Sequence, residues 1–236
     1  MSEEWAPPKA TVDSTAAAEA GPSGHFYDLG VLAKVVTGLL IASVSLNTIL
    51  ALFEMFAYAS RLEDTELGLL IVGLFLMLVG FAALAILVVN LPLWVLFHYR
   101  AAKNLRALGH TGLVHTPAAQ VYWWFVPIAN LFMPFGATAE LIRASESQDD
   151  SWVFTPKPSS MAFWWALHIG AKILSGISSR LVFIEGMEYW GAVLNLLYLP
   201  LLIGSTVLYV GYLHRICNGQ RRQRERQLKA TASSTP

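Results

Sequence analysis

The chain has 236 residues, of which 55% are hydrophobic and only 14% are charged, and its mean hydropathy is +0.51. This composition excludes an ordinary soluble domain and is typical of a polytopic membrane protein. The formal net charge is zero, and the single cysteine, Cys217, excludes an internal disulfide and a cysteine-based metal site.

The beginning of the chain predicts a disordered cytoplasmic tail, residues 1–30. This stretch is acidic and rich in Ala, Pro, Ser and Thr, a composition that buries too little apolar surface to fold. It lacks a basic start followed by an apolar run, so we expect no cleavable signal peptide.

Four segments are apolar over the roughly 20 residues that a helix needs to cross a hydrocarbon core of about 30 Å. They are Val31–Tyr58, Leu67–Phe97, Met161–Ile184 and Trp190–Leu213. The second continues at helical spacing past Pro92 to Gly109, a suitable residue to end a helix. We therefore predict a helical membrane domain over residues 31–214.

The stretch from Val121 to Ser145 is also apolar, but Pro127, Asn130 and Pro134 interrupt it. Trp123 and Trp124 at its start suit the headgroup level of a bilayer. The prolines leave backbone carbonyls without partners, which is costly in lipid. We expect the Asn130 amide to satisfy some of these groups.

The distribution of cations favours a re-entrant or interfacial course for residues 121–142. If this segment spans, the cations between residues 100 and 106 lie on the opposite side from those near the C-terminus. If it returns, thirteen of the sixteen Lys and Arg lie on or near one side, as the positive-inside rule demands. We predict an all-α integral membrane protein with four transmembrane helices plus a Pro-broken re-entrant or interfacial helix. Five spans are the alternative.

The end of the chain predicts a basic cytoplasmic tail, residues 215–236. Six cations next to a span favour anionic lipid headgroups over nucleic acid, and they fix topology. These candidates are Arg215, Arg221, Arg222, Arg224, Arg226 and Lys229.

Ionisable and polar residues inside apolar segments are costly there and become functional candidates. The candidates are Glu54, His168, Lys172, Ser175 and Ser179. The last four recur at helical spacing and predict one polar stripe facing the bundle interior or a wet cleft. The stripe provides a path for protons, ions or a small polar ligand, or it joins helices, with Lys172 paired to Glu54.

No catalytic motif or phosphate-binding loop is present in the sequence. His110 and His115 lack a neighbouring carboxylate or thiol and make a poor metal site. Glu140 and Arg143, at i and i+3, are expected to pair. We therefore expect no enzyme activity, cofactor or metal.

Three motifs carry a resemblance to a known family: "YRAAKNLRALG", "WWFVPIANLFMPFGATAELIRAS" and "WWALHIGAKILSGISSRL". Together they resemble the bacterial membrane family called domain of unknown function 4328, over about Leu32 to Arg215. The resemblance implies a multi-helix domain in a bacterial cytoplasmic (inner) membrane and supplies no activity. Met133 stands where the family often has a cation, and Lys172 where it often has an uncharged polar residue.

Two functions follow from these observations as hypotheses. The first is a non-enzymatic accessory or scaffold protein with cytoplasmic termini, acting through helix and lipid contacts, including a protein partner or a second copy. The alternative is a small transporter or channel that uses the polar stripe on the helix at 161–184.

Overall fold

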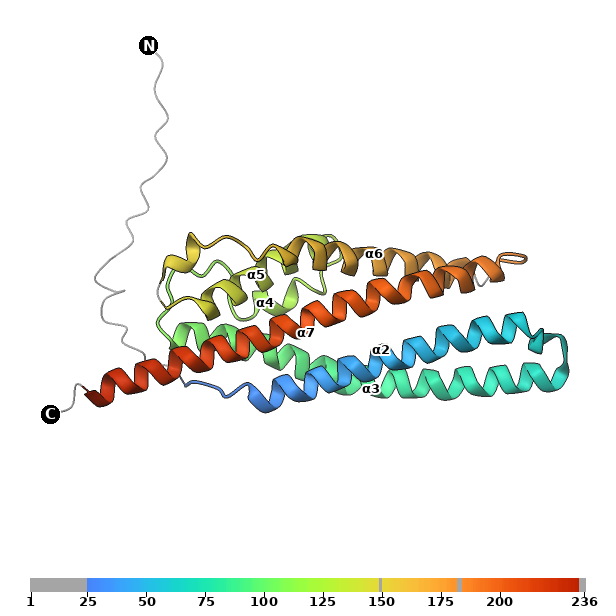
Figure 1. Ribbon diagram of the computed structural model, residues 1–236, viewed down its shortest axis with the longest axis horizontal. Helices are drawn as coiled ribbons and strands as arrows, with labels where there is room; N and C mark the ends of the chain where they lie inside the picture. Colours follow the sequence, from blue (N-terminus) through green and yellow to red (C-terminus); the bar gives the residue numbers. More distant parts are fainter. Residues whose placement is uncertain (1–24, 149, 182–183, 234–236) are drawn as a thin grey trace, which may run out of the picture.

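The computed structural model describes residues 25–148, 150–181 and 184–233, and every regular element within them is helical (Figure 1). The long helices are α2 (Gly30–Ala59), α3 (Glu66–Ala107), α6 (Ser160–Leu181) and α7 (Glu188–Ser233). The shorter ones are η1 (Leu62–Asp64), α4 (Ala119–Tyr122), η2 (Ala129–Leu131), α5 (Met133–Glu146) and η3 (Asp150–Val153).

The prediction of an all-α protein is confirmed in these residues, and three helices, α2, α3 and α7, are long and apolar enough to cross a membrane. The fourth predicted span, α6, forms close to its expected bounds but is not among these three. Its polar side chains, Lys172 and Arg180 among them, explain its lower hydropathy.

A tight connection joins α2 to α3 because the sequence supplies a cap there. The Thr65 hydroxyl accepts a hydrogen bond of 3.0 Å from the Gly68 amide, which satisfies one of the free donors at the start of α3. A β-carbon at Gly68 would lie 2.6 Å from the Leu62 carbonyl carbon. Only glycine therefore allows the chain to turn back so closely.

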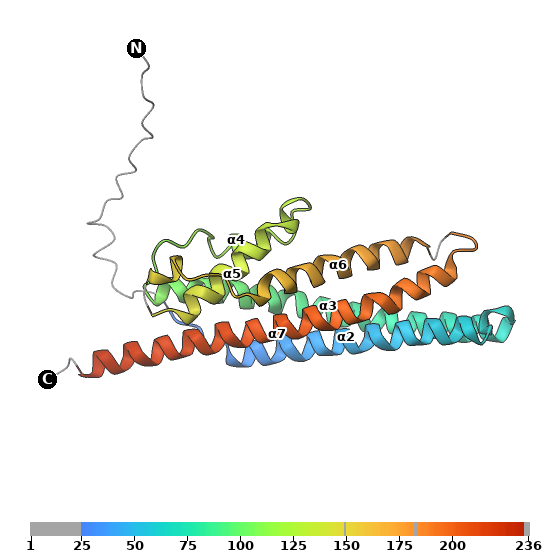
Figure 2. The same ribbon diagram turned by 45° about the horizontal axis from the view of Figure 1, so that its top comes forward.

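Helix α7 lies at the centre of the arrangement (Figures 1 and 2). It packs along α6 on one side and along α2 on the other, and α3 lies against α2. The α2–α3 and α6–α7 connections lie at one end of the molecule, and α5 and the C-terminus lie at the other. We call these the hairpin end and the α5 end.

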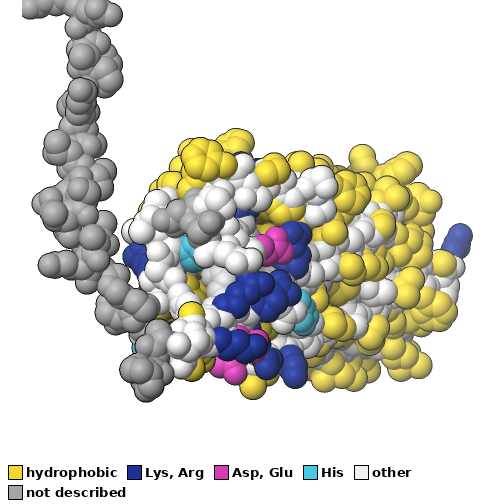
Figure 3. Space-filling view, turned by 60° about the vertical axis from the view of Figure 1, so that its left-hand side comes forward, with side chains coloured by type: hydrophobic (Ala, Val, Ile, Leu, Met, Phe, Trp, Pro, Cys, Tyr) yellow, Lys and Arg dark blue, Asp and Glu magenta, His cyan; other side chains and the backbone are white. Residues whose placement is uncertain are grey.

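The main buried core lies toward the α5 end. Phe97, Leu105, Leu141 and Ile216 are almost fully buried there, together with residues from α2 and α6. Toward the hairpin end, many large apolar side chains of α2 and α3 are exposed. Figure 3 shows hydrophobic side chains covering most of the molecule beyond the α5 end.

Residues 121–142, interrupted by prolines and called the broken segment below, double back instead of forming one long helix (Figure 2). The Glu140 carboxylate on α5 accepts hydrogen bonds of 2.9 Å from the Val114 amide and 3.1 Å from the His115 amide, just before α4. The segment therefore starts and finishes near the same end of the bundle.

Helix α7 continues without interruption past the predicted boundary at residue 215, to Ser233, and packs against α3 and α5. A β-carbon at Gly219 would lie 2.8 Å from the Ser145 carbonyl carbon, so α5 and α7 touch closely there. The Gln220 amide nitrogen donates to the Ala101 carbonyl at 2.9 Å and to the Ser145 hydroxyl at 3.1 Å. Ile216, Gln220 and Gln223 are therefore buried in the helical core, whereas residues 228–233 are exposed.

The predicted disordered tail falls mostly on residues 1–24, outside the described residues. Its last part is packed rather than disordered: Leu29 is buried. The Tyr27 amide donates to Asn104 Oδ1 at 2.8 Å, and the Asn104 amide nitrogen donates back to the Tyr27 carbonyl at 2.8 Å.

Candidate functional site

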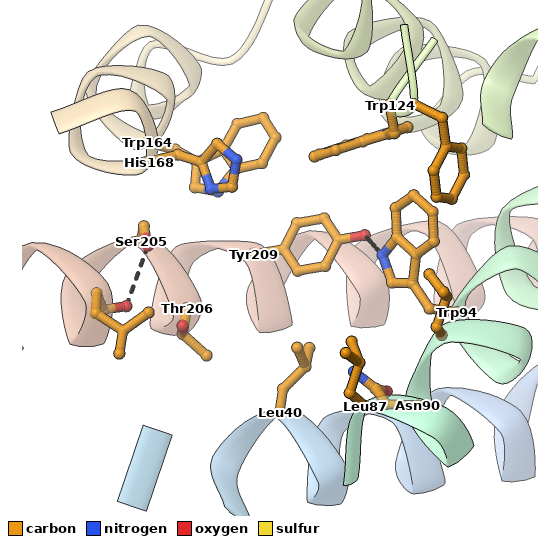
Figure 4. A pocket seen from close by; sticks show the side chains of 13 residues that line it. Leu40, Leu87, Asn90, Trp94, Trp124, Trp164, His168, Ser205, Thr206 and Tyr209 are labelled. Carbon is orange, nitrogen blue, oxygen red and sulfur yellow. Dashed lines mark hydrogen bonds between the residues drawn. The ribbon is translucent and has the colours of Figure 1, made fainter. Parts of the chain in front are cut away.

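A cavity of about 370 Å³ lies where α2, α3, α6, α7 and the broken segment meet (Figure 4). Its size falls in the range of small-molecule sites, which are mostly apolar with a few placed polar groups. Trp94 from α3, Trp124 from the broken segment, Trp164 from α6 and Tyr209 from α7 line it. We call it the aromatic pocket.

Two hydrogen bonds fix Tyr209 in this pocket. The Trp94 indole N–H donates to the Tyr209 hydroxyl oxygen at 2.5 Å, and the same hydroxyl lies 2.5 Å from His98 Nε2. Because indole is only a donor, the hydroxyl proton is free to go to His98 Nε2. The Tyr209 hydroxyl is therefore bonded to both neighbours, whereas His98 Nδ1 is buried with no partner among the described residues.

Three other residues of the pocket carry buried polar atoms that have no partner among the described residues. These atoms are Asn90 Oδ1, Trp124 Nε1 and His168 Nε2. A buried polar group without a hydrogen bond costs free energy, so such groups are uncommon in folded proteins. Three of them around one cavity make this cavity a candidate ligand site.

The predicted polar stripe on α6 does not have one uniform environment. His168 lines the aromatic pocket and is half-buried. Lys172 and Ser179 are exposed in the single chain, and Ser175 is half-buried. The buried face of α6 instead contains Trp164, Ala171 and Ser178 among others.

Glu54 has a hydrogen-bond partner on α7. The Asn195 amide nitrogen donates to its carboxylate at 2.6 Å, and Asn47 on α2 accepts a bond of 3.3 Å from the Tyr198 hydroxyl. Among the described residues Lys172 forms no ion pair with Glu54. These polar groups join α2 to α7.

In the broken segment, the Trp165 indole and not the Asn130 amide forms a hydrogen bond to a backbone carbonyl. The Trp165 indole N–H donates to the Leu131 carbonyl at 3.0 Å. Asn130 Oδ1 is buried with no partner among the described residues. Pro127 is exposed. Pro134 lies in the first turn of α5, where its missing N–H costs nothing.

The tip of this element is apolar and exposed. Ile128 is 78% exposed, Phe132 69% and Phe125 56%. Trp123, beside Trp124, is half-buried, and its indole N–H also has no partner among the described residues. We call residues 125–133 the apolar tip.

The six cations of the C-terminal stretch divide into two groups. Arg215 forms a two-pronged ion pair with Glu146, at 2.7 and 2.8 Å. The Arg221 side chain donates to Glu225 one turn later, at 3.0 Å, and Arg224 is half-buried, with its guanidinium over the Phe26 ring. The remaining three, Arg222, Arg226 and Lys229, are exposed.

Figure 3 shows basic side chains gathered on the face at the α5 end, with acidic ones beside them.

A buried row of glutamines on α7 was not anticipated from the sequence. Gln223 donates to the Ala144 carbonyl at 2.8 Å and to the Ser145 carbonyl at 2.9 Å, and Gln227 donates to the Leu108 carbonyl at 2.8 Å. The spacing of Gly219, Gln220, Gln223 and Gln227 is the signal that could have found this face.

The expected pairing of Glu140 with Arg143 is wrong. Glu140 is occupied by the chain before α4 and lies 3.1 Å from His115 Nδ1, whereas Arg143 donates to the Thr155 carbonyl at 3.0 Å. Within the described residues there is no cluster of three or more His, Cys, Asp or Glu that could hold a metal ion.

Long apolar helices around a buried polar and aromatic centre define the class of this chain, a helical membrane protein. The family model described as "Domain of unknown function (DUF4328)" matches residues 70–216. The chain therefore belongs to this family, as the sequence motifs predicted. The comparisons with curated proteins and with solved structures gave no match.

Proposed function

We propose that this chain is a non-enzymatic accessory or scaffold protein of a bacterial cytoplasmic membrane, acting through contacts with lipid and with other helices. Helices α2, α3, α6 and α7 span the membrane, and residues 121–142 form a re-entrant element. Both termini and the α5 end are cytoplasmic, and the hairpin end is outside. The protein does not bind nucleic acid, and a protein partner or a second copy covers part of its helix surface.

Several features support this topology. Helix α6 has 22 residues, or about 33 Å at 1.5 Å per residue, which matches a hydrocarbon core. It runs beside α7, which is itself long and apolar enough to cross. The broken segment doubles back, and Arg61 and Arg180 stand apart from most cations, which lie toward the α5 end, as the positive-inside rule requires.

The topology is tested by labelling from outside the cell. In a Cys217→Ser background, single cysteines replace the exposed residues Asp64, Ser159 and Glu185. A membrane-impermeant thiol reagent should label positions 64 and 185 and leave 159 protected. Labelling at 159 with protection at 185 would mean that the broken segment crosses the membrane, which contradicts four spans.

One observation carries the proposed mode of action: the apolar tip is exposed beside the bundle, and the exposed arginines of α7 lie beyond it toward the C-terminus (Figure 2). Exposed apolar groups at this level enter the inner leaflet, and nearby cations attract anionic headgroups by about 1 kcal/mol each. The apolar tip then contacts the acyl region of one leaflet while the cations contact its headgroups, and neither contact requires a chemical reaction.

The lipid preference is measured with the full-length protein in nanodiscs that contain phosphatidylglycerol and phosphatidylcholine. We expect phosphatidylglycerol to be enriched around the protein. Replacing Arg222, Arg226 and Lys229 by Gln should abolish most of this enrichment, and added salt should weaken it. The matched control replaces Arg61 and Arg180 by Gln at the other end and should retain it; equal losses in both variants would contradict the proposal.

Transport is the competing outcome. Ion flux through liposomes that contain the purified protein, lost on Lys172→Met, would replace the accessory role by the small transporter or channel that uses the α6 stripe. The exposure of Lys172 and Ser179 in the single chain favours the accessory role, because these residues and His168 do not line one enclosed path.

A further inference from the structure

The aromatic pocket has the chemistry of a ligand site that lipid and helix contacts alone do not require. We propose that it binds a neutral amphiphile whose head is a flat ring bearing carbonyl oxygens, the chemistry of a quinone, and whose apolar tail extends into the bilayer. This inference rests on the spanning arrangement proposed above and not on the accessory role.

The walls favour a flat ring. The Trp164 and Tyr209 rings are stacked 5.6 Å apart and almost parallel, at 10°. The Trp94 and Trp124 rings meet edge to face, 5.1 Å apart and at 85°. In Figure 4, Trp124 lies across the cavity from Trp164 and His168, with Tyr209 and Trp94 along one side. Aromatic rings pack against such faces and edges more favourably than a branched or globular head does.

The polar complement is uncharged. None of the described residues that line the pocket is Asp, Glu, Lys or Arg. Trp124 Nε1 is a fixed donor, Asn90 offers an amide oxygen, and His168 Nε2 donates or accepts according to its tautomer. A carbonyl oxygen on the ligand accepts from Trp124. The His168 ring meets the Trp124 ring edge to face, 5.9 Å away, so it donates to the same end of the ligand in the tautomer that carries its proton on Nε2. A charged head would meet no counter-ion on this lining, and burying it there would be costly.

The pocket also provides an exit for a tail. Leu87 on α3 and Phe125 in the apolar tip both line the cavity, yet they are 57% and 56% exposed. The rim of the pocket therefore reaches the outer surface of the helices, which faces lipid in the proposed arrangement. A tail leaving there stays in hydrocarbon while the ring stays among the aromatic side chains.

Binding is tested with tritiated decylubiquinone and the full-length protein in phosphatidylcholine nanodiscs. We expect saturable binding that empty nanodiscs lack. Trp124→Phe keeps one aromatic ring but removes the N–H donor and part of the indole, so affinity should fall about three- to tenfold. The matched control is Trp123→Phe, whose indole N–H also lacks a partner but lies outside the pocket lining; its affinity should not change.

A melting measurement separates a loss of affinity in these variants from a loss of folded protein. Trp124→Phe and Trp123→Phe lose the same part of an indole ring at half-buried positions, so the melting curves of both variants in the same nanodiscs identify any loss of stability. A second pair of variants blocks the pocket from its rim. Leu87→Trp fills the opening and should abolish binding, whereas Leu84→Trp, one turn earlier and equally exposed at 55%, should not.

Three outcomes would overturn the proposal. The first is no saturable binding of decylubiquinone by the folded parent protein. The second is an equal affinity of Trp124→Phe and Trp123→Phe, which would refute the hydrogen bond, or of Leu87→Trp and Leu84→Trp, which would refute the location. The third is competition by oleate that depends on Lys172, which would show a site for an anionic amphiphile.

Discussion

The contact between α5 and α7 is so close that one methyl group should loosen the α5 end. In Gly219→Ala, the new β-carbon overlaps the Ser145 carbonyl oxygen and lies 2.8 Å from its carbon, so the helices must separate. Overpacking of this kind costs roughly 1–3 kcal/mol. The separation also weakens hydrogen bonds from Gln220 and Gln223 to Ser145 and its neighbours, at about 1 kcal/mol each.

The intrinsic preference of a helix for alanine returns about 1 kcal/mol, so the net destabilisation should be about 2–4 kcal/mol. The control is Gly211→Ala on the same helix, where a β-carbon meets nothing within 4 Å and stability should be equal or higher. Both variants are melted in the same detergent and followed by tryptophan fluorescence. A Gly219→Ala protein that melts with or above Gly211→Ala would refute the close approach of α5 and α7.

Two further results follow from polar contacts between segments. Trp165→Phe should lower the melting temperature, because a carbonyl of the broken segment loses its donor at a cost of about 1–3 kcal/mol. Asn130→Leu should be neutral or stabilising, because Oδ1 of that amide has no partner among the described residues. The reverse order of the two melting temperatures would show that Asn130 supports the backbone. In double-mutant cycles measured by melting, Glu54→Gln and Asn195→Leu should show a coupling free energy of about 1 kcal/mol. The effects of Glu54→Gln and Lys172→Met on stability should be additive. Coupling of Glu54 to Lys172 alone would count against the α2–α7 contact.

The lengths and limits of the long helices could be predicted closely, because hydropathy and capping are local properties. The predicted Val31–Tyr58 became Gly30–Ala59, and Leu67–Phe97 with its continuation to Gly109 became Glu66–Ala107. Membership of the family followed from local motifs as well. These features depend on residues within a few turns of one another, so no knowledge of packing was needed.

The role of individual polar residues could not be predicted in the same way. Asn47 and Asn195 form hydrogen bonds between α2 and α7, whereas Asn90, of the same type and also within an apolar helix, lines the pocket with its oxygen unpaired. Likewise, Trp165 rather than Asn130 contacts the broken backbone. Residue type states which bonds a side chain is able to form, but the neighbouring helix decides which of them it forms.

The sequence by itself determined that this is a helical membrane protein, where α2, α3 and α6 begin and end, and that its cations favour a segment which turns back. Only the tertiary structure decided that α7 runs on past residue 215 with Ile216, Gln220 and Gln223 buried, and that an aromatic pocket exists. The Trp94–Tyr209 contact joins residues 115 positions apart, and the Gln220–Ala101 contact joins residues 119 apart. Periodicity shows which face of a helix is apolar, but a cavity arises where several faces meet, and that meeting depends on packing over the whole chain.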